Sequence, residues 1–212
     1  MKIIIPAREG SKGFPHKNRK LFKYTVQSIP VAVRENVYVT SDDTKILKMA
    51  KNSGFNCIER PADLAQDTTS MKEVIVHALS EMKVDDNELV AVLYLTYPER
   101  RWIDLMDAVA FYLIMEPAMP VSSLLCKKKV KSNPFLCMYD LGHRGKQIIK
   151  HDLYRRQDYL DCFELSHFIV LLRPGNIDNL NNNLYDSETL FWEIEDKVDV
   201  DHEKDFLKIN AN

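Results

Sequence analysis

The sequence predicts an α/β fold in which a mostly parallel sheet carries helices on both faces. Segments of strand character alternate three times with segments of helix character along the first half of the 212-residue chain, an order typical of parallel sheets. The run at residues 89–95 is almost continuously apolar, as expected for a central strand buried on both faces. Ligands of such doubly wound sheets bind at the carboxyl ends of the strands. The residues that follow each strand are therefore the first candidates for function.

The elements of this first half follow one another closely. The opening apolar run, Ile3–Ile5, stops at Pro6. Asp43 ends a Ser-Asp-Asp sequence that favours a helix N-terminus, and Gly54 closes the helix that follows it. Ser70 gives a second N-terminal signal of this kind. The expected strands cover residues 3–5, 36–40, 55–59 and 89–95, and the expected helices cover residues 23–29, 44–53, 71–82 and 102–115.

The pattern changes in the second half of the chain. Strands are expected over 121–129 and 168–172, and residues 133–151 are expected to form a hairpin around the sequence Leu-Gly-His-Arg-Gly. No helix separates the hairpin from the strand before it. An extended pair outside the main sheet exposes strand edges, so we expect a partner subunit to cover it. The length fits one domain, residues 1–212, with the hairpin as an arm of it.

Composition excludes several classes of protein. The net charge is −2, from 29 basic and 31 acidic side chains, which does not favour a general nucleic-acid binder. The cysteines, Cys57, Cys126, Cys137 and Cys162, form no CxxC pair, so neither a zinc site nor a disulfide framework is indicated. No apolar run approaches the ~18 residues of a membrane span. We therefore expect a cytoplasmic protein that binds neither nucleic acid nor membrane.

The loop after the first strand is the first candidate site. It carries Arg8, Lys12, His16 and Lys17 with two glycines between them. Glycines let backbone N–H groups approach an anion, and the cations supply charge for a polyphosphate. The spacing fits neither the Walker loop nor the dinucleotide-binding GxGxxG pattern. From the residues alone, a phosphate site and a solvated basic loop both remain open.

Two further groups could carry chemistry. Asp199 and Asp201 flank one residue, so an extended backbone would point both carboxylates to one side, and paired carboxylates near phosphates can hold Mg²⁺. A solvated acidic segment explains the same residues. Arg155, Arg156 and Gln157 could clamp a carboxylate or phosphate, or form a surface basic pair.

Six segments in fixed order carry a family pattern. The first is IPAREGSKGFPHKN at residues 5–18, which matches the pattern IPARxGSKGxPxKN. The others are TSDD at 40–43, RPADLAQDTTS at 60–70, LYLTYPERR at 93–101, RRQ at 155–157 and VDVDHEKDF at 198–206. Together they resemble the acylneuraminate cytidylyltransferase family, whose members couple CTP to an acidic nonulosonic or octulosonic sugar and release pyrophosphate.

The resemblance implies a Rossmann-like nucleotidyltransferase sheet, with residues 133–151 in the place of the family's dimerisation arm, and hence a homodimer. It implies the substrates CTP and a sugar acid, and Mg²⁺ held by Asp199 and Asp201. Arg8, Lys12 and Asp201 are the implied catalytic residues. The implied nucleotide-binding residues are Ala7, Arg8, Ser11, Lys12, Lys17, Asn18, Arg60, Asp67, Thr68 and Thr69. The implied sugar-binding residues are Tyr94, Thr96, Arg100, Arg156, Gln157 and His167.

The chain departs from the family pattern at positions that face the sugar. Tyr94 stands where the family has Gln, Leu95 where it has Pro and Tyr97 where it has Ser. Ser166 and His167 replace an Asn-Gly pair. These changes leave two alternatives to sugar-acid transfer: a catalytically lapsed nucleotide-binding relative, and a nucleotidyltransferase for a different sugar or base.

Overall fold

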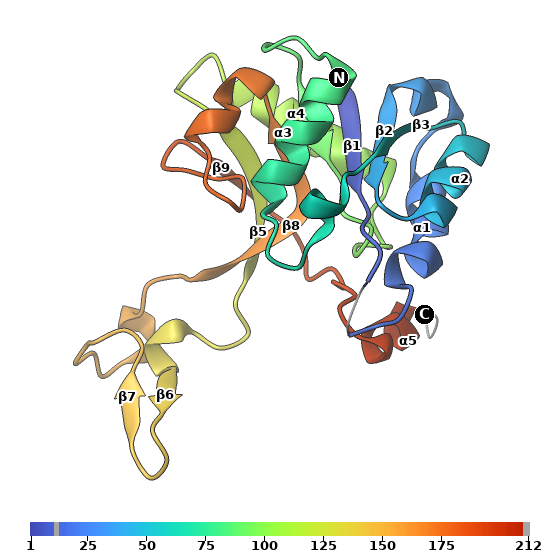
Figure 1. The fold of residues 1–212 in the computed structure, drawn as a ribbon. Helices are drawn as coiled ribbons and strands as arrows, with labels where there is room; N and C mark the ends of the chain where they lie inside the picture. Colours follow the sequence, from blue (N-terminus) through green and yellow to red (C-terminus); the bar gives the residue numbers. More distant parts are fainter. Residues whose placement is uncertain (11–12, 210–212) are drawn as a thin grey trace.

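The computed structural model describes residues 1–10 and 13–209. Over these residues the strands form a seven-stranded central sheet and a separate two-stranded hairpin (Figure 1). From edge to edge, the central sheet contains β3 (Asn56–Glu59), β2 (Val37–Ser41), β1 (Lys2–Pro6), β4 (Val90–Val92), β8 (Phe163–Leu172), β5 (Ser123–Lys129) and β9 (Leu190–Glu193). β8 runs antiparallel to β4 and β5, whereas the other neighbouring pairs are parallel. The predicted mostly parallel α/β fold is confirmed.

The connections out of β1 and β4 diverge: from β1 the chain moves to β2 on one side, and from β4 it moves to β5 on the other, which creates a switch point in the strand order. β1 pairs with β2 on one side and with β4 on the other. The chain therefore leaves the sheet in opposite directions from neighbouring strands, and a crevice forms outside their carboxyl ends. The first candidate loop, at residues 7–16, begins at this edge.

Helices cover both faces of the sheet. Ile3 and Ile5 of β1 belong to the core that packs under α1 (Lys17–Ser28), α2 (Thr44–Asn52) and α4 (Trp102–Met115). Ile4 points to the opposite face and packs with α3 (Met71–Met82). This alternation follows from the two-residue period of a strand, and it accounts for the nearly continuous apolar character of β1 and β4.

The predicted helix starts at α2 and α3 are confirmed. Asp43 accepts hydrogen bonds from the backbone N–H groups of Lys45 and Ile46. Ser70 forms a reciprocal capping box with Glu73. Both arrangements satisfy N–H groups that have no partner inside the helix.

Several boundaries and two whole elements differ from the sequence-based expectation; β8, for example, begins at Phe163 rather than at residue 168. α1 begins at Lys17 rather than at residue 23, because polar side chains in its first turns bond inward to the loop and hide the helical pattern. β9 was not expected: it is a four-residue edge strand with alternating half-buried and exposed residues. The helix α5 (Glu203–Ile209) was also missed, because its acidic sequence gives little apolar signal.

The predicted hairpin is confirmed as β6 (Met138–Asp140) and β7 (Gly145–Gln147), which pair antiparallel. Figure 1 shows it standing away from the central sheet at the end of two extended segments. Its exposed apolar side chains include Met138, Tyr139, Leu141 and Ile148. Its role as a dimerisation arm stays a prediction. Among residues 1–10 and 13–209, no helix combines the length and apolar character needed to cross a membrane.

Arg100 ties two strands of the sheet together from inside. Its side chain is 4% exposed. Nη1 donates to the carbonyl oxygen of Phe168 in β8 at 2.7 Å, and Nη2 donates to that of Tyr94, just after β4, at 2.8 Å. Burial lowers the pKa of Arg100 to about 10. The two carbonyl groups would lose their partners if this guanidinium were removed.

Replacing Arg100 with methionine is expected to destabilise the fold by about 2–4 kcal/mol, because buried carbonyl groups left unpaired carry a desolvation cost. Chemical denaturation measures the change in the free energy of unfolding. Arg155→Met is the matched control, since Arg155 and Asp158 form an ion pair at the surface at 2.9 Å and exposed pairs contribute about 0–1 kcal/mol. Equal effects of the two variants would contradict the role given to Arg100.

Candidate functional site

The site starts where β1 ends. Ala7 is completely buried, and its N–H donates to the carbonyl oxygen of Thr40 at 3.0 Å. The Ser41 hydroxyl donates to the carbonyl oxygen of Ala7. Because its N–H and its carbonyl group are both bonded to β2, Ala7 fixes the direction in which the chain enters the loop.

Arg8 lies opposite the loop that follows β3. Its Nη1 forms an ion pair with Oδ1 of Asp67 at 2.5 Å, and the two side chains are 36% and 43% exposed. The adjoining Thr69 hydroxyl donates to the carbonyl oxygen of Asp63 at 3.2 Å, while Thr68 is exposed. The structure therefore brings together Arg8 and Asp67, two of the residues whose nucleotide-binding role the resemblance implies.

Arg60 places a second cation next to Arg8. It is 5% exposed, and its Nη2 donates to the carbonyl oxygen of Thr40 at 2.9 Å. Burial lowers the pKa of Arg60 to about 10, the charge of Asp42 acts in the opposite direction, and the charge of Arg8 lowers it further. An anion bound between the two guanidinium groups would relieve this repulsion. The cavity beside them is lined by Asp42, Glu59, Arg60, Pro61, Ala62, Ala65 and Gln66.

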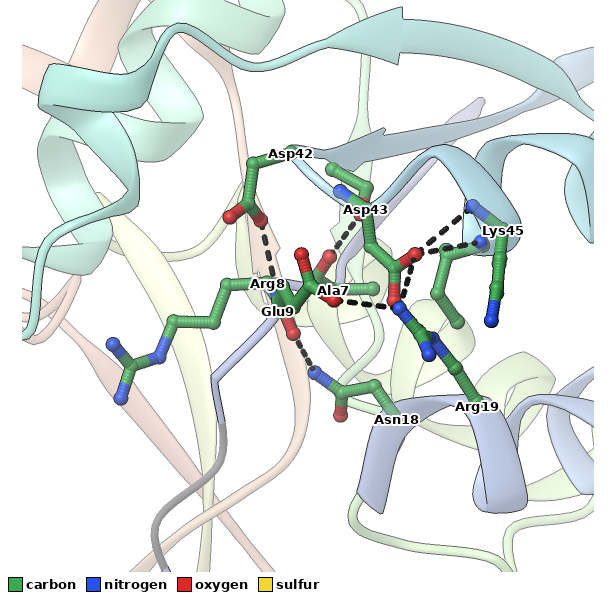
Figure 2. A network of polar contacts seen from close by, with 10 residues as sticks. Ala7, Arg8, Glu9, Asn18, Arg19, Asp42, Asp43 and Lys45 are labelled. Carbon is green, nitrogen blue, oxygen red and sulfur yellow. Dashed lines mark hydrogen bonds and ion pairs between the residues drawn. The ribbon is translucent and has the colours of Figure 1, made fainter. Parts of the chain in front are cut away.

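A polar network holds the start of the loop (Figure 2). Asn18 Nδ2 donates to the carbonyl oxygen of Arg8 at 2.8 Å. The N–H of Glu9 donates to Oδ1 of Asp42 at 2.8 Å, and the Glu9 carboxylate pairs with Arg19 at 2.6 Å. Sequence reasoning missed Glu9, Arg19 and Asp42. The position of Arg19 directly after Asn18, on the helix that leaves the loop, was the one available signal.

Ser11 and Lys12 lie outside the described residues. Lys17, in the first turn of α1, forms an ion pair with Oδ1 of Asp201 at 3.0 Å. A Cβ atom on Gly13 would lie 3.0 Å from the carbonyl oxygen of Asp201 and 3.0 Å from Nδ1 of His202. This close approach requires glycine and places the aspartate segment directly against the loop.

The aspartate segment is held by the backbone of another loop. The N–H of Val200 donates to the carbonyl oxygen of Thr96 at 2.9 Å, and the Val200 side chain is completely buried. Its neighbours Asp199 and Asp201 differ in their surroundings. Oδ1 of Asp199 is buried and has no hydrogen-bond partner within the described part of the chain, whereas Asp201 faces Lys17.

An unpaired buried carboxylate oxygen beside a second carboxylate fits a hard cation. Mg²⁺ is commonly held by one or two carboxylates together with substrate phosphates. Over residues 1–10 and 13–209, no group of three or more His, Cys, Asp and Glu side chains is arranged to hold a metal ion. A cation held by Asp199 and Asp201 would therefore need further ligands from a substrate.

The residues that depart from the family pattern cluster beside Asp199. The rings of Tyr94 and His167 lie 5.2 Å apart, and Ser166 Oγ donates to the Tyr97 hydroxyl at 3.3 Å. Burial raises the pKa of Tyr97, and the charge of Asp199 raises it further. Burial lowers the pKa of His167, although the Asn183 backbone and Asp199 act against this.

Three predicted sugar-binding residues lie apart from that cluster or are already engaged. The guanidinium of Arg100 donates to the two backbone carbonyl groups described above. Arg156 and Gln157 are exposed in a short turn that follows the arm, and Arg156 lines a cavity with Asn133 and Tyr159. Within one chain, the structure does not bring Arg156 and Gln157 to Asp199, and their sugar-binding role stays a prediction.

The chain is similar to known cytidylyltransferases. The family described as Cytidylyltransferase matches residues 2–95. N-acylneuraminate cytidylyltransferase of Escherichia coli O18:K1:H7 is 35% identical over 133 residues, which cover 59% of this chain and 31% of that protein. N-acylneuraminate cytidylyltransferase of Streptococcus agalactiae serotype III is 23% identical over 97% of this chain and 51% of that protein. The chain thus spans about a third to about half the length of these curated relatives.

Among solved structures, CMP:2-keto-3-deoxy-manno-octonic acid synthetase complexed with CTP superposes with a TM-score of 0.69. It is 15% identical, and the match covers 99% of this chain and 96% of that one. At this identity the likeness concerns the fold. The family match to residues 2–95 and the two curated relatives agree in kind: the chain is similar in sequence to cytidylyltransferases.

Proposed function

We propose that the protein transfers the cytidylyl group of CTP to a hydroxyl group of an acidic nonulosonic or related sugar and releases pyrophosphate. The match of residues 2–95 to the Cytidylyltransferase family and the relatives named N-acylneuraminate cytidylyltransferase support the reaction class. The observation that carries the proposal is the convergence of Arg8 and Arg60 from the ends of two strands, with Asp67 facing Arg8. Two cations at the switch point of a parallel sheet suit a polyphosphate.

The chemistry assigns a role to each part of the site. A sugar oxygen forms a bond to the α-phosphorus, the bond from that phosphorus to the bridging oxygen breaks, and pyrophosphate leaves with the electron pair. Negative charge grows on the transferring and leaving phosphates, so Arg8, Lys12 and Lys17 would stabilise the transition state. Asn18 and Arg60 would support the nucleotide. Asp67, Thr68 and Thr69 would line the cytosine side.

Asp199 and Asp201 would hold Mg²⁺ in the proposed reaction. The buried, unpaired Oδ1 of Asp199 supports this assignment. Bound Mg²⁺ would supply positive charge to the phosphate oxygens. Lys17, which pairs with Asp201 here, would then be released to contact phosphate.

The proposal also covers the residues that would bind the sugar acid and the assembly of a homodimer. Tyr94, Thr96 and His167 lie near Asp199 and would contact the sugar acid. Arg156 and Gln157, in the turn after the arm, would do so from the other subunit of a homodimer. The exposed apolar residues of the arm support such an interface. We place the reaction in the cytoplasm, where CTP is available.

One observation favours a second candidate function. The contact between the Tyr94 and His167 rings occupies space beside Asp199 where smaller side chains would leave room for a sugar. A catalytically lapsed relative that binds nucleotide alone is consistent with this contact. So is a nucleotidyltransferase for a different sugar or base.

With Mg²⁺ present, we expect pyrophosphate release from CTP with at least one member of a panel of nonulosonic and octulosonic acids. A coupled pyrophosphate assay measures the release, and the other ribonucleoside triphosphates serve as controls for the base. CTP binding without release for any sugar acid would favour the lapsed relative. If pyrophosphate is released only with another triphosphate, that nucleotide and not CTP is the substrate.

Arg8→Ala is expected to lower the rate of transfer about 10²- to 10³-fold, as for loss of one preorganised charge donor, while the melting temperature stays near that of the parent. Steady-state kinetics and thermal unfolding check both parts. Lys48→Ala is the control, since it removes an exposed cation of α2 outside the site. Unchanged turnover in Arg8→Ala would remove Arg8 from the mechanism.

Asp199→Asn is expected to abolish the gain in CTP affinity that Mg²⁺ gives, because the variant loses a charged ligand for the ion. Calorimetric titration of CTP with Mg²⁺ and with a chelator measures this gain without any turnover. Asp196→Asn is the control: Asp196 lies in the same acidic segment and pairs with Lys131 at 3.3 Å. A full magnesium effect in Asp199→Asn would place the ion elsewhere.

A further inference from the structure

The residue after Arg8 is tied to two other segments. The N–H of Glu9 donates to Oδ1 of Asp42 at 2.8 Å, and its Oε1 lies 2.6 Å from Nη2 of Arg19. On the other side, Asn18 holds the carbonyl oxygen of Arg8. The backbone on both sides of the Arg8 Cα is therefore fixed from outside the loop, as Figure 2 shows.

Arg19 is itself rigidly held. Its Nε donates to Oδ2 of Asp43 at 2.6 Å, and its Nη2 donates to Oδ1 of Asp43 at 3.0 Å. Asp43 is 3% exposed and caps α2. Burial tends to raise the pKa of Asp43, but the hydrogen bonds from Arg19 and the backbone outweigh it and lower the pKa. One planar guanidinium thus joins the helix cap to Glu9.

The bond from Arg19 to Glu9 is a poor source of stability. The Glu9 side chain is 52% exposed, and exposed ion pairs contribute about 0–1 kcal/mol because solvent screens them. The bond instead fixes the position of the Glu9 side chain relative to Arg19. Through Arg19, it joins Glu9 at the start of the loop to the buried carboxylate of Asp43 at the start of α2.

We propose that Arg19 and Glu9 are positioning residues that orient Arg8 toward the phosphates of the nucleotide. This inference rests on the phosphate-binding role proposed for Arg8. The Arg8 guanidinium points away from the network in Figure 2, and it pairs with Asp67. Arg19 and Glu9 contact neither phosphate nor sugar in this scheme and act through the Arg8 backbone.

Positioning and simple electrostatics predict opposite results for Glu9. Removing a negative charge near a polyphosphate site strengthens anion binding if only the electric field matters. If Glu9 holds the loop, the same change weakens binding. Arg19→Lys separates the two effects again, since it keeps the charge but cannot bridge Asp43 and Glu9 with one planar group.

The experiment measures CTP affinity by calorimetry and melting temperature for Glu9→Gln, Arg19→Lys and the double variant. We expect each single variant to weaken CTP binding about 5- to 50-fold, within the range that small misplacements of a binding group produce. The double variant should bind no more weakly than the worse single variant, because both remove one interaction. The melting temperature of Glu9→Gln should stay at the parent value.

Glu59→Gln is the matched control. Glu59 lines the cavity beside Arg60, so the substitution removes the same charge near the same site, and CTP affinity should stay equal or rise. Tighter binding by Glu9→Gln, unchanged binding by Arg19→Lys, or losses that parallel a lowered melting temperature would each overturn the positioning role. Unchanged binding by Arg8→Ala would instead remove the proposed phosphate site itself.

Discussion

The parallel pairing of β1 with β2 and β4 is the constraint on which the rest of the structure depends. It aligns the carboxyl ends of neighbouring strands, so the residues that follow them meet at one edge. The bonds from Ala7 to Thr40 and from Arg60 to Thr40 extend this alignment beyond the strands. Arg8, Arg60 and Asp67 come together for that reason. The aspartate segment joins them through one further backbone bond, from Val200 to Thr96.

The nucleotide side and the sugar side of the proposed site differ in how firmly they are built. On the nucleotide side, the loop entrance is bonded to β2, to α1 and to the cap of α2. On the sugar side, Tyr94, Tyr97, Ser166 and His167 pack against one another beside Asp199. Aromatic rings at this place make the surface less polar than amide side chains would. A sugar acid bound there would meet ring faces and the half-buried carboxylate of Asp199.

Much of the fold could be predicted from the sequence, because its signals are local. Asp43 and Ser70 mark helix starts through hydrogen bonds to residues two or three positions away, and buried strands are visible as apolar runs. β9 and α5 escaped prediction because their short sequences gain stability from distant partners, such as Phe14 against Phe206. In the site, Arg8 and Asp67 could be named from motifs. Arg19 could not, since its importance arises only when Asp43 and Glu9 are brought beside it.

The place of β8 has a consequence for how the chain folds. β8 lies between β4 and β5, although it follows both in sequence. During synthesis the strands up to β4 can pair, but β4 keeps an open edge until residue 172 has left the ribosome. Such late, long-range pairing slows folding and exposes strand edges meanwhile. The region of the family match, residues 2–95, contains β4 but not β8. We therefore expect that region alone to aggregate rather than fold.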